Sequence, residues 1–69
     1  MAKSKIYRSQ MAHARLRNLY KKRGNNTKNK LYACYHDTCI KHQELKGRVL
    51  SRSERRKLFL YYFDNLWNK

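Results

Sequence analysis

Two cysteines and two histidines stand close together in the segment CYHDTCIKH, as Cys34, His36, Cys39 and His42. Thiolates and imidazoles are the ligands that Zn²⁺ prefers, so this segment has the composition of a metal site. Structural zinc sites, however, take pairs of ligands from two separated segments, and one continuous helix cannot turn all four side chains toward a single ion. We expect no metal and no other cofactor. Instead, Cys34 and His42 are expected to face the core, with Cys39 near its boundary.

Histidines are also the usual acid and base of a ribonuclease, and the chain has three, His13, His36 and His42. No second catalytic group lies at a spacing from these histidines that would indicate such a reaction. The chain has only four acidic residues, which are few for a mechanism that uses paired carboxylates or two metal ions. The sequence also has no glycine-rich phosphate-binding loop. We therefore expect that the protein is not an enzyme.

Charge is the strongest signal in the sequence. Eighteen Lys and Arg stand against four Asp and Glu among 69 residues, which gives a net charge of +14. Residues 1–30 carry ten of the basic residues and no acidic one. A compact domain with this charge repels itself, and a polyanion relieves the repulsion, so nucleic acid is the expected partner.

Contacts to phosphates supply affinity and position a protein without reading base sequence. The basic residues are dispersed over the whole chain, which suits a protein embedded in folded RNA, and Tyr7, Tyr20 and Tyr32 lie among them as candidates for stacking on unpaired bases. DNA is the alternative, read by a helix-turn-helix with Gly47 in the turn. The residues expected to contact nucleic acid are Arg8, Arg15, Arg17, Lys21, Lys22, Arg23, Lys28, Lys30, Lys46, Arg48, Arg52, Arg55, Arg56 and Lys57.

Helices must position these side chains, because the chain has no proline and only two glycines. A first helix is expected over 3–23, with one apolar stripe of Tyr7, Met11 and Ala14 and another of Ala12, Leu16, Leu19 and Tyr20. The basic residues before Gly24 favour a helix end there, and residues 24–30 read as a loop.

A second helix is expected over 30–46, with an apolar stripe of Leu31, Cys34, Tyr35, Thr38, His42 and Leu45. Ser51 and Glu54 form a capping box that predicts the start of a third helix. That helix begins with arginines and ends in LFLYYFDNLW, with Phe59, Tyr62, Phe63 and Leu66 as its core stripe. Its remaining apolar surface exceeds what two short helices cover, so we expect a protein partner over 58–67, contacted by Leu58, Tyr61 and Trp67, with an RNA surface as the alternative.

Length limits the fold to one small domain over residues 1–69, with a core that gives only about 3–5 kcal/mol. We expect an all-α, three-helix unit, with the alternative that part of it is extended and ordered only by its partner. The longest apolar run, six residues from 58 to 63, is too short for a transmembrane segment. Cys34 and Cys39 lie on different sides of a helix, so free thiols are expected, in the cytoplasm or another reducing compartment, including an organellar matrix.

These observations predict a non-catalytic RNA-binding protein that contacts the phosphate backbone within a ribonucleoprotein. A ribosome-associated or similar structural role is the simplest version. The alternative is a small regulator or inhibitor of the phage type, which binds nucleic acid and blocks an enzyme or toxin that acts on nucleic acid.

Overall fold

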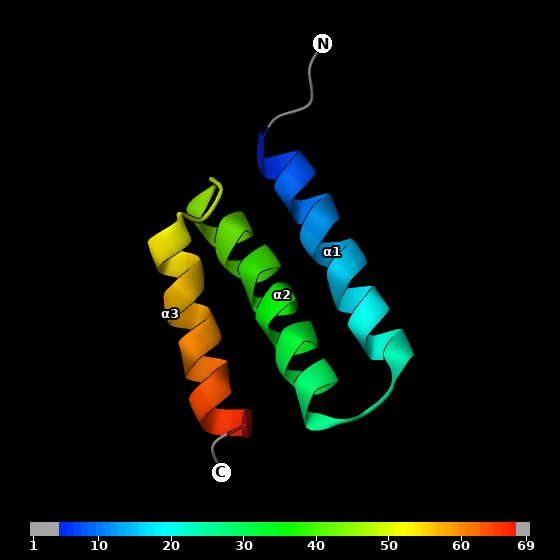
Figure 1. Cartoon of the computed structure of the whole chain (residues 1–69). Coiled ribbons are helices and arrows are strands. Elements are labelled where there is room, and N and C mark those ends of the chain that lie inside the picture. The colour runs from blue at the N-terminus through cyan, green and yellow to red at the C-terminus, as the bar shows by residue number, and fades with distance from the viewer. Residues whose placement is uncertain (1–4, 68–69) are drawn as a thin grey trace.

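Three α-helices lie side by side in the computed structural model, which describes residues 5–67 (Figure 1). They are α1 (Lys5–Arg23), α2 (Thr27–Lys46) and α3 (Arg52–Tyr62), and α3 continues into a π-helical turn, η1 (Phe63–Trp67). The predicted all-α, three-helix fold is confirmed. The second helix is the middle one, and in the described part no Cα atom of α1 comes within 8 Å of one in α3. The helices therefore form one layer rather than a closed bundle.

The ends of α2 explain why it is longer than predicted. The side chain of Asn26 accepts a hydrogen bond of 2.8 Å from the backbone N–H of Asn29, which caps the helix so that it begins at Thr27. The loop predicted over 24–30 is wrong in its second half, because residues 27–30 are helical. At the other end Gly47 takes a left-handed conformation, with φ of 68°, and its N–H donates to the carbonyl of Gln43.

The predicted capping box begins α3 as expected. Ser51 Oγ accepts from the N–H of Glu54, and the Glu54 carboxylate accepts from the N–H of Ser51 at 2.9 Å. The same carboxylate binds Lys46 at 2.8 Å and Arg48 at 2.7 Å. The hydrogen bond from Arg48, followed by the one from Lys46, holds the pKa of Glu54 well below its usual range. One acidic residue thus caps α3 and ties it to the end of α2.

The apolar stripe predicted for α2 is confirmed at Leu31, Tyr35, Thr38 and His42, which are buried or half-buried, and is wrong at the two residues that are exposed, Cys34 and Leu45. The helix also packs on a second side, which the single stripe did not include. Toward α1 it buries Asn29, Ala33, His36 and Gln43, whereas Tyr35 and Thr38 lie toward α3. Cys34 is exposed and Leu45 is 86% exposed, while Cys39 is fully buried, which reverses the expected places of the two cysteines. His42 is half-buried beside Leu50 and Leu58. A helix between two neighbours needs two packed faces, so its buried residues do not follow one apolar stripe along the sequence.

The interface between α1 and α2 is polar, contrary to the two apolar stripes expected for the first helix. Gln43, with no exposed surface, accepts from Ser9 at 2.9 Å and donates to Gln10 at 2.7 Å. One turn further along α1, His13 and His36 form a hydrogen bond of 2.8 Å. Several residues of the expected stripes stay exposed instead, namely Tyr7, Met11, Ala12, Leu16 and Leu19. Hydrogen bonds between buried or half-buried side chains therefore contribute to holding these two helices together.

Candidate nucleic-acid interface

Ion pairs divide the predicted phosphate-contacting residues into two groups. Asp37 binds Arg17 at 2.9 Å and also Lys41 at 3.3 Å. The hydrogen bond from Arg17 lowers the pKa of Asp37. Arg17 thus forms an ion pair with a carboxylate within the chain, as Lys46 and Arg48 do with Glu54. These three predicted site residues contribute to holding the helices together.

The other eleven predicted residues are all exposed, and within residues 5–67 none of them forms an ion pair with a carboxylate. They are Arg8, Arg15, Lys21, Lys22, Arg23, Lys28, Lys30, Arg52, Arg55, Arg56 and Lys57. The guanidinium of Arg23 lies 5.7 Å from the centre of the Tyr20 ring, a cation–π contact. Exposed cations without a carboxylate neighbour are free to meet an external anion, so this group is the candidate interface.

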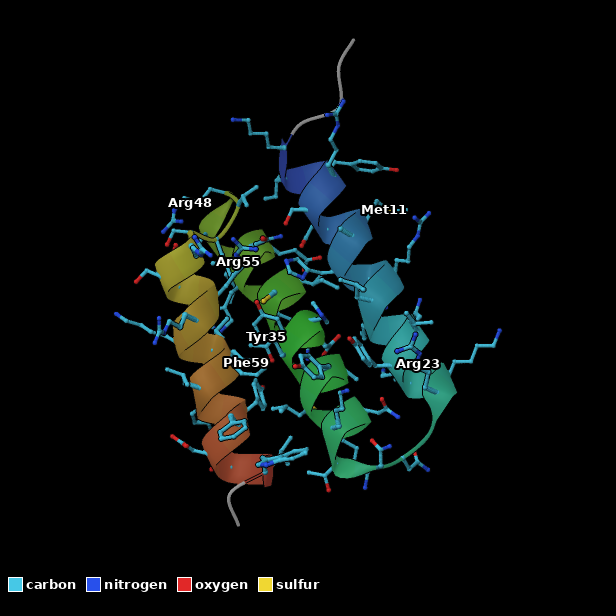
Figure 2. The ribbon with its side chains drawn as sticks, in the orientation of Figure 1. Met11, Arg23, Tyr35, Arg48, Arg55 and Phe59 are labelled. Atoms are coloured by element: carbon cyan, nitrogen blue, oxygen red, sulfur yellow. The ribbon has the colours of Figure 1, made fainter. Side chains whose placement is uncertain are left out.

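The eleven cations come from all three helices, as Figure 2 shows for Arg23 at the end of α1 and Arg55 between α2 and α3. Arg8 and Arg15 border a shallow hollow on the outer side of α1, together with Tyr7 and Met11. A second hollow, near the start of α2, includes Lys21 and Lys30. The structure therefore brings the predicted residues together only in small groups and leaves their charge spread around the molecule.

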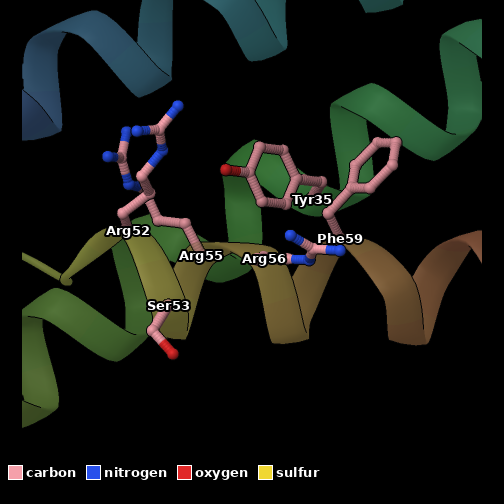
Figure 3. Close-up of a pocket in the computed structure, with 6 residues that line it drawn as sticks. All are labelled: Tyr35, Arg52, Ser53, Arg55, Arg56 and Phe59. Atoms are coloured by element: carbon pink, nitrogen blue, oxygen red, sulfur yellow. The ribbon is translucent and has the colours of Figure 1, made fainter.

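The most concentrated group lies in a groove between α2 and the first turns of α3 (Figure 3). We call it the arginine–aromatic groove; it is lined by Tyr35, Arg52, Ser53, Arg55, Arg56 and Phe59 and has a volume of about 670 Å³. The rings of Tyr35 and Phe59 are nearly perpendicular, with centres 5.6 Å apart. Burial raises the pKa of Tyr35 to about 12, so its hydroxyl stays protonated and able to donate. Sequence reasoning found the arginines but not their aromatic neighbours.

An aromatic row links this groove to the other helices. The ring of Phe59 lies 5.6 Å from Tyr32 and 6.1 Å from Phe63. Tyr20 of α1 stacks on Tyr32 at 4.9 Å, and Trp67 stacks on Phe63 at 6.1 Å. Of the three tyrosines predicted to stack on bases, Tyr20 and Tyr32 thus stack on each other, and Tyr7 is 45% exposed on α1. These rings stabilise the helix packing as well as lining the surface.

The three residues predicted to meet a protein partner do not share one hollow. Leu58 is half-buried beside His42, in the second half of α2. Trp67 lies beside Lys28, at the beginning of α2, and Tyr61 is 61% exposed. Leu58 and Trp67 therefore lie beside different halves of the middle helix.

The cysteines and histidines are also separated by the fold. In the described chain, no three His, Cys, Asp or Glu residues gather closely enough to hold a metal ion. Burial lowers the pKa of His36 to about 4, with the neighbouring His13 as the second cause. The pairing of these two histidines could not be found from their spacing of 23 residues, because helical periodicity does not relate positions on different helices.

No helix among residues 5–67 combines the length and apolar character needed to cross a membrane. The chain matches no protein-family model, no curated protein and no solved structure. Its function is therefore argued from the geometry and charge of its own residues.

Proposed function

We propose that this protein binds RNA without catalysing a reaction, mainly through the phosphate backbone, as a structural component of a ribonucleoprotein such as a ribosome-associated particle. The observation that carries the proposal is the set of eleven exposed cations that form no ion pair with a carboxylate within residues 5–67. Phosphates supply the missing negative charge, and binding releases the counterions condensed on the nucleic acid. The energetic gain comes from relieving self-repulsion as well as from new contacts.

The spread of these cations favours RNA over duplex DNA. A helix-turn-helix protein concentrates its contacts on one helix that enters the major groove and crosses its neighbour steeply. Here α2 and α3 run alongside each other, and the free cations belong to every helix (Figure 1). Folded RNA presents phosphates on several strands at once, and such a ligand matches cations on several sides of a small protein.

The test is a titration of labelled single-stranded RNA and duplex DNA at several salt concentrations. RNA should bind more tightly, and log affinity should fall with log salt by about 0.7 for each phosphate contact on a single strand. Lys22→Gln should reduce that slope, whereas the matched variant Lys41→Gln should change it less, because Lys41 already faces Asp37. A slope near zero, or tighter binding to duplex DNA, would contradict the proposal.

A second candidate, the phage-type inhibitor of an enzyme or toxin acting on nucleic acid, is favoured by exposed apolar side chains on α3. Leu60 is 46% exposed and its neighbour Tyr61 is 61% exposed. Apolar surface of this kind is typical of a protein contact. A pulldown with and without RNase separates the two functions: partners retained after RNase treatment support the inhibitor, and partners lost with the RNA support the ribonucleoprotein.

A further inference from the structure

We infer that the arginine–aromatic groove binds one unpaired nucleotide of a single RNA strand, with its base against Phe59 and Tyr35 and its flanking phosphates on Arg52, Arg55 and Arg56. This inference rests on the proposed RNA binding and adds to it that the preferred ligand is unpaired at this site. The phosphate contacts elsewhere on the molecule have no such requirement.

The two rings make the groove suitable for a base. Phe59 and Tyr35 both line the groove, are half-buried, and lie side by side with their rings nearly perpendicular (Figure 3). A flat base gains from stacking on such a surface whatever its sequence. Within a duplex the base faces are covered by neighbouring pairs, and only backbone and groove edges are accessible. The aromatic part of the groove therefore distinguishes unpaired from paired nucleotides.

The three guanidinium groups make the groove suitable for phosphate. They lie in the first turns of α3, where the helix dipole disfavours positive charge. The nearest capping carboxylate, Glu54, is occupied by Lys46 and Arg48. Burial, and after it the positive charge of Arg55, lower the pKa of His13, so the charge of this groove residue acts on a side chain of α1. A phosphate oxyanion would stabilise the arginines, and guanidinium binds phosphate through two parallel hydrogen bonds.

The size and the surroundings of the groove also fit a strand. Its volume of about 670 Å³ lies within the range of roughly 300–1,000 Å³ typical of small-molecule sites. Phe59 also borders another hollow, which lies at the far end of α3 and is lined by Lys28 and Trp67. A bound strand can thus continue from the arginines along the aromatic row toward another exposed cation.

The experiment compares three labelled ligands by fluorescence anisotropy: an oligouridine of about ten nucleotides, the same backbone without bases, and an RNA duplex of equal length. Phe59→Leu keeps an apolar side chain but removes the ring. It should weaken oligouridine binding about tenfold and leave the abasic chain, the duplex and the salt slope unchanged. The matched control, Tyr61→Leu, removes an exposed ring outside the groove and should leave all three affinities unchanged.

Photocrosslinking of the unaltered protein to 4-thiouridine RNA tests the same site without depending on a variant that folds. Crosslinks mapped to Tyr35 or Phe59 support the groove. Equal affinity for all three ligands, with no crosslink at these rings, would overturn the groove and leave the proposed phosphate binding standing. Absence of binding to every RNA at low salt would overturn both, and a preference for single-stranded DNA would overturn the RNA assignment.

Discussion

His13 and His36 face each other across the interface of α1 and α2, with their Nδ1 atoms 2.8 Å apart. Such a contact needs one nitrogen that carries a proton and one that does not. Both rings are buried, and burial is the main cause that lowers the pKa of each. If both were charged, two N–H groups and two positive charges would oppose each other in the interface. The pair therefore makes the helix packing sensitive to acid.

We predict that the free energy of unfolding decreases as the pH falls from about 7 to about 5. The unfolded chain takes up protons near the ordinary histidine pKa of 6.5, whereas the folded pair resists, so acid favours unfolding. With a folded pKa of about 4, His36 alone should cost about 2 kcal/mol at pH 5. Urea unfolding across this range measures the effect. His36→Gln should flatten the dependence; equal stability at both pH values would contradict the prediction.

Replacing Gln43 by Leu should destabilise the protein although it puts an apolar side chain at a buried position. Its amide accepts from Ser9 and from the backbone N–H of Leu50 and donates to Gln10, so the substitution removes all three hydrogen bonds. Buried groups left without partners should cost about 2–3 kcal/mol, measured by urea unfolding. Leu45→Ala, at an 86% exposed position of the same helix, should stay within about 0.5 kcal/mol. A larger loss of stability in Leu45→Ala would show that Leu45 is buried and that α2 turns a different face to its neighbours.

The two cysteines should react at very different rates with a thiol reagent such as Ellman's reagent. Cys34 is exposed, whereas Cys39 is fully buried and burial raises the pKa of its thiol. We expect one thiol to react quickly in the folded protein and the second only after denaturation. Cys34→Ser should abolish the fast phase. Fast reaction of the remaining thiol in that variant would place Cys39 at the surface.

Exchanging Arg52, Arg55 and Arg56 together for Gln should leave the fold intact and weaken RNA binding. None of the three has a carboxylate neighbour in the described chain, and Gln is a comparable helix former. Circular dichroism and melting should stay unchanged or improve, while the salt slope should fall by about 2. Exchanging Lys46 and Arg48 for Gln is the matched control: it breaks the ion pairs of Glu54 and should lower the melting temperature. Unfolding of the triple variant would show that these three arginines hold the fold together, as Lys46 and Arg48 are expected to do.

The sequence alone predicts the helix count and the start of α3, because a capping box and the absence of proline act locally. The length of α2 is missed at Asn26, whose capping role depends on a single side-chain hydrogen bond. Its packed face toward α1 is missed because a single apolar stripe assumes one neighbour, whereas this helix has two. For the interface, composition identifies the cations. Only the fold shows that Asp37 and Glu54 engage some of them and that Tyr35 and Phe59 adjoin others.

The layered arrangement also has a consequence for how the molecule opens. In the part of the chain that the structure describes, each outer helix packs on α2, and no Cα atom of one outer helix comes within 8 Å of the other, so either can detach in a partial unfolding event while the remaining pair persists. Amide hydrogen exchange should accordingly be slowest in the middle helix and faster in the two outer ones. Release of α3 would separate Phe59 from Tyr35, whereas release of α1 would leave that pair in place. The groove that we propose for an RNA strand and the packed pair of α1 and α2 are thus separately fluctuating parts of one short chain.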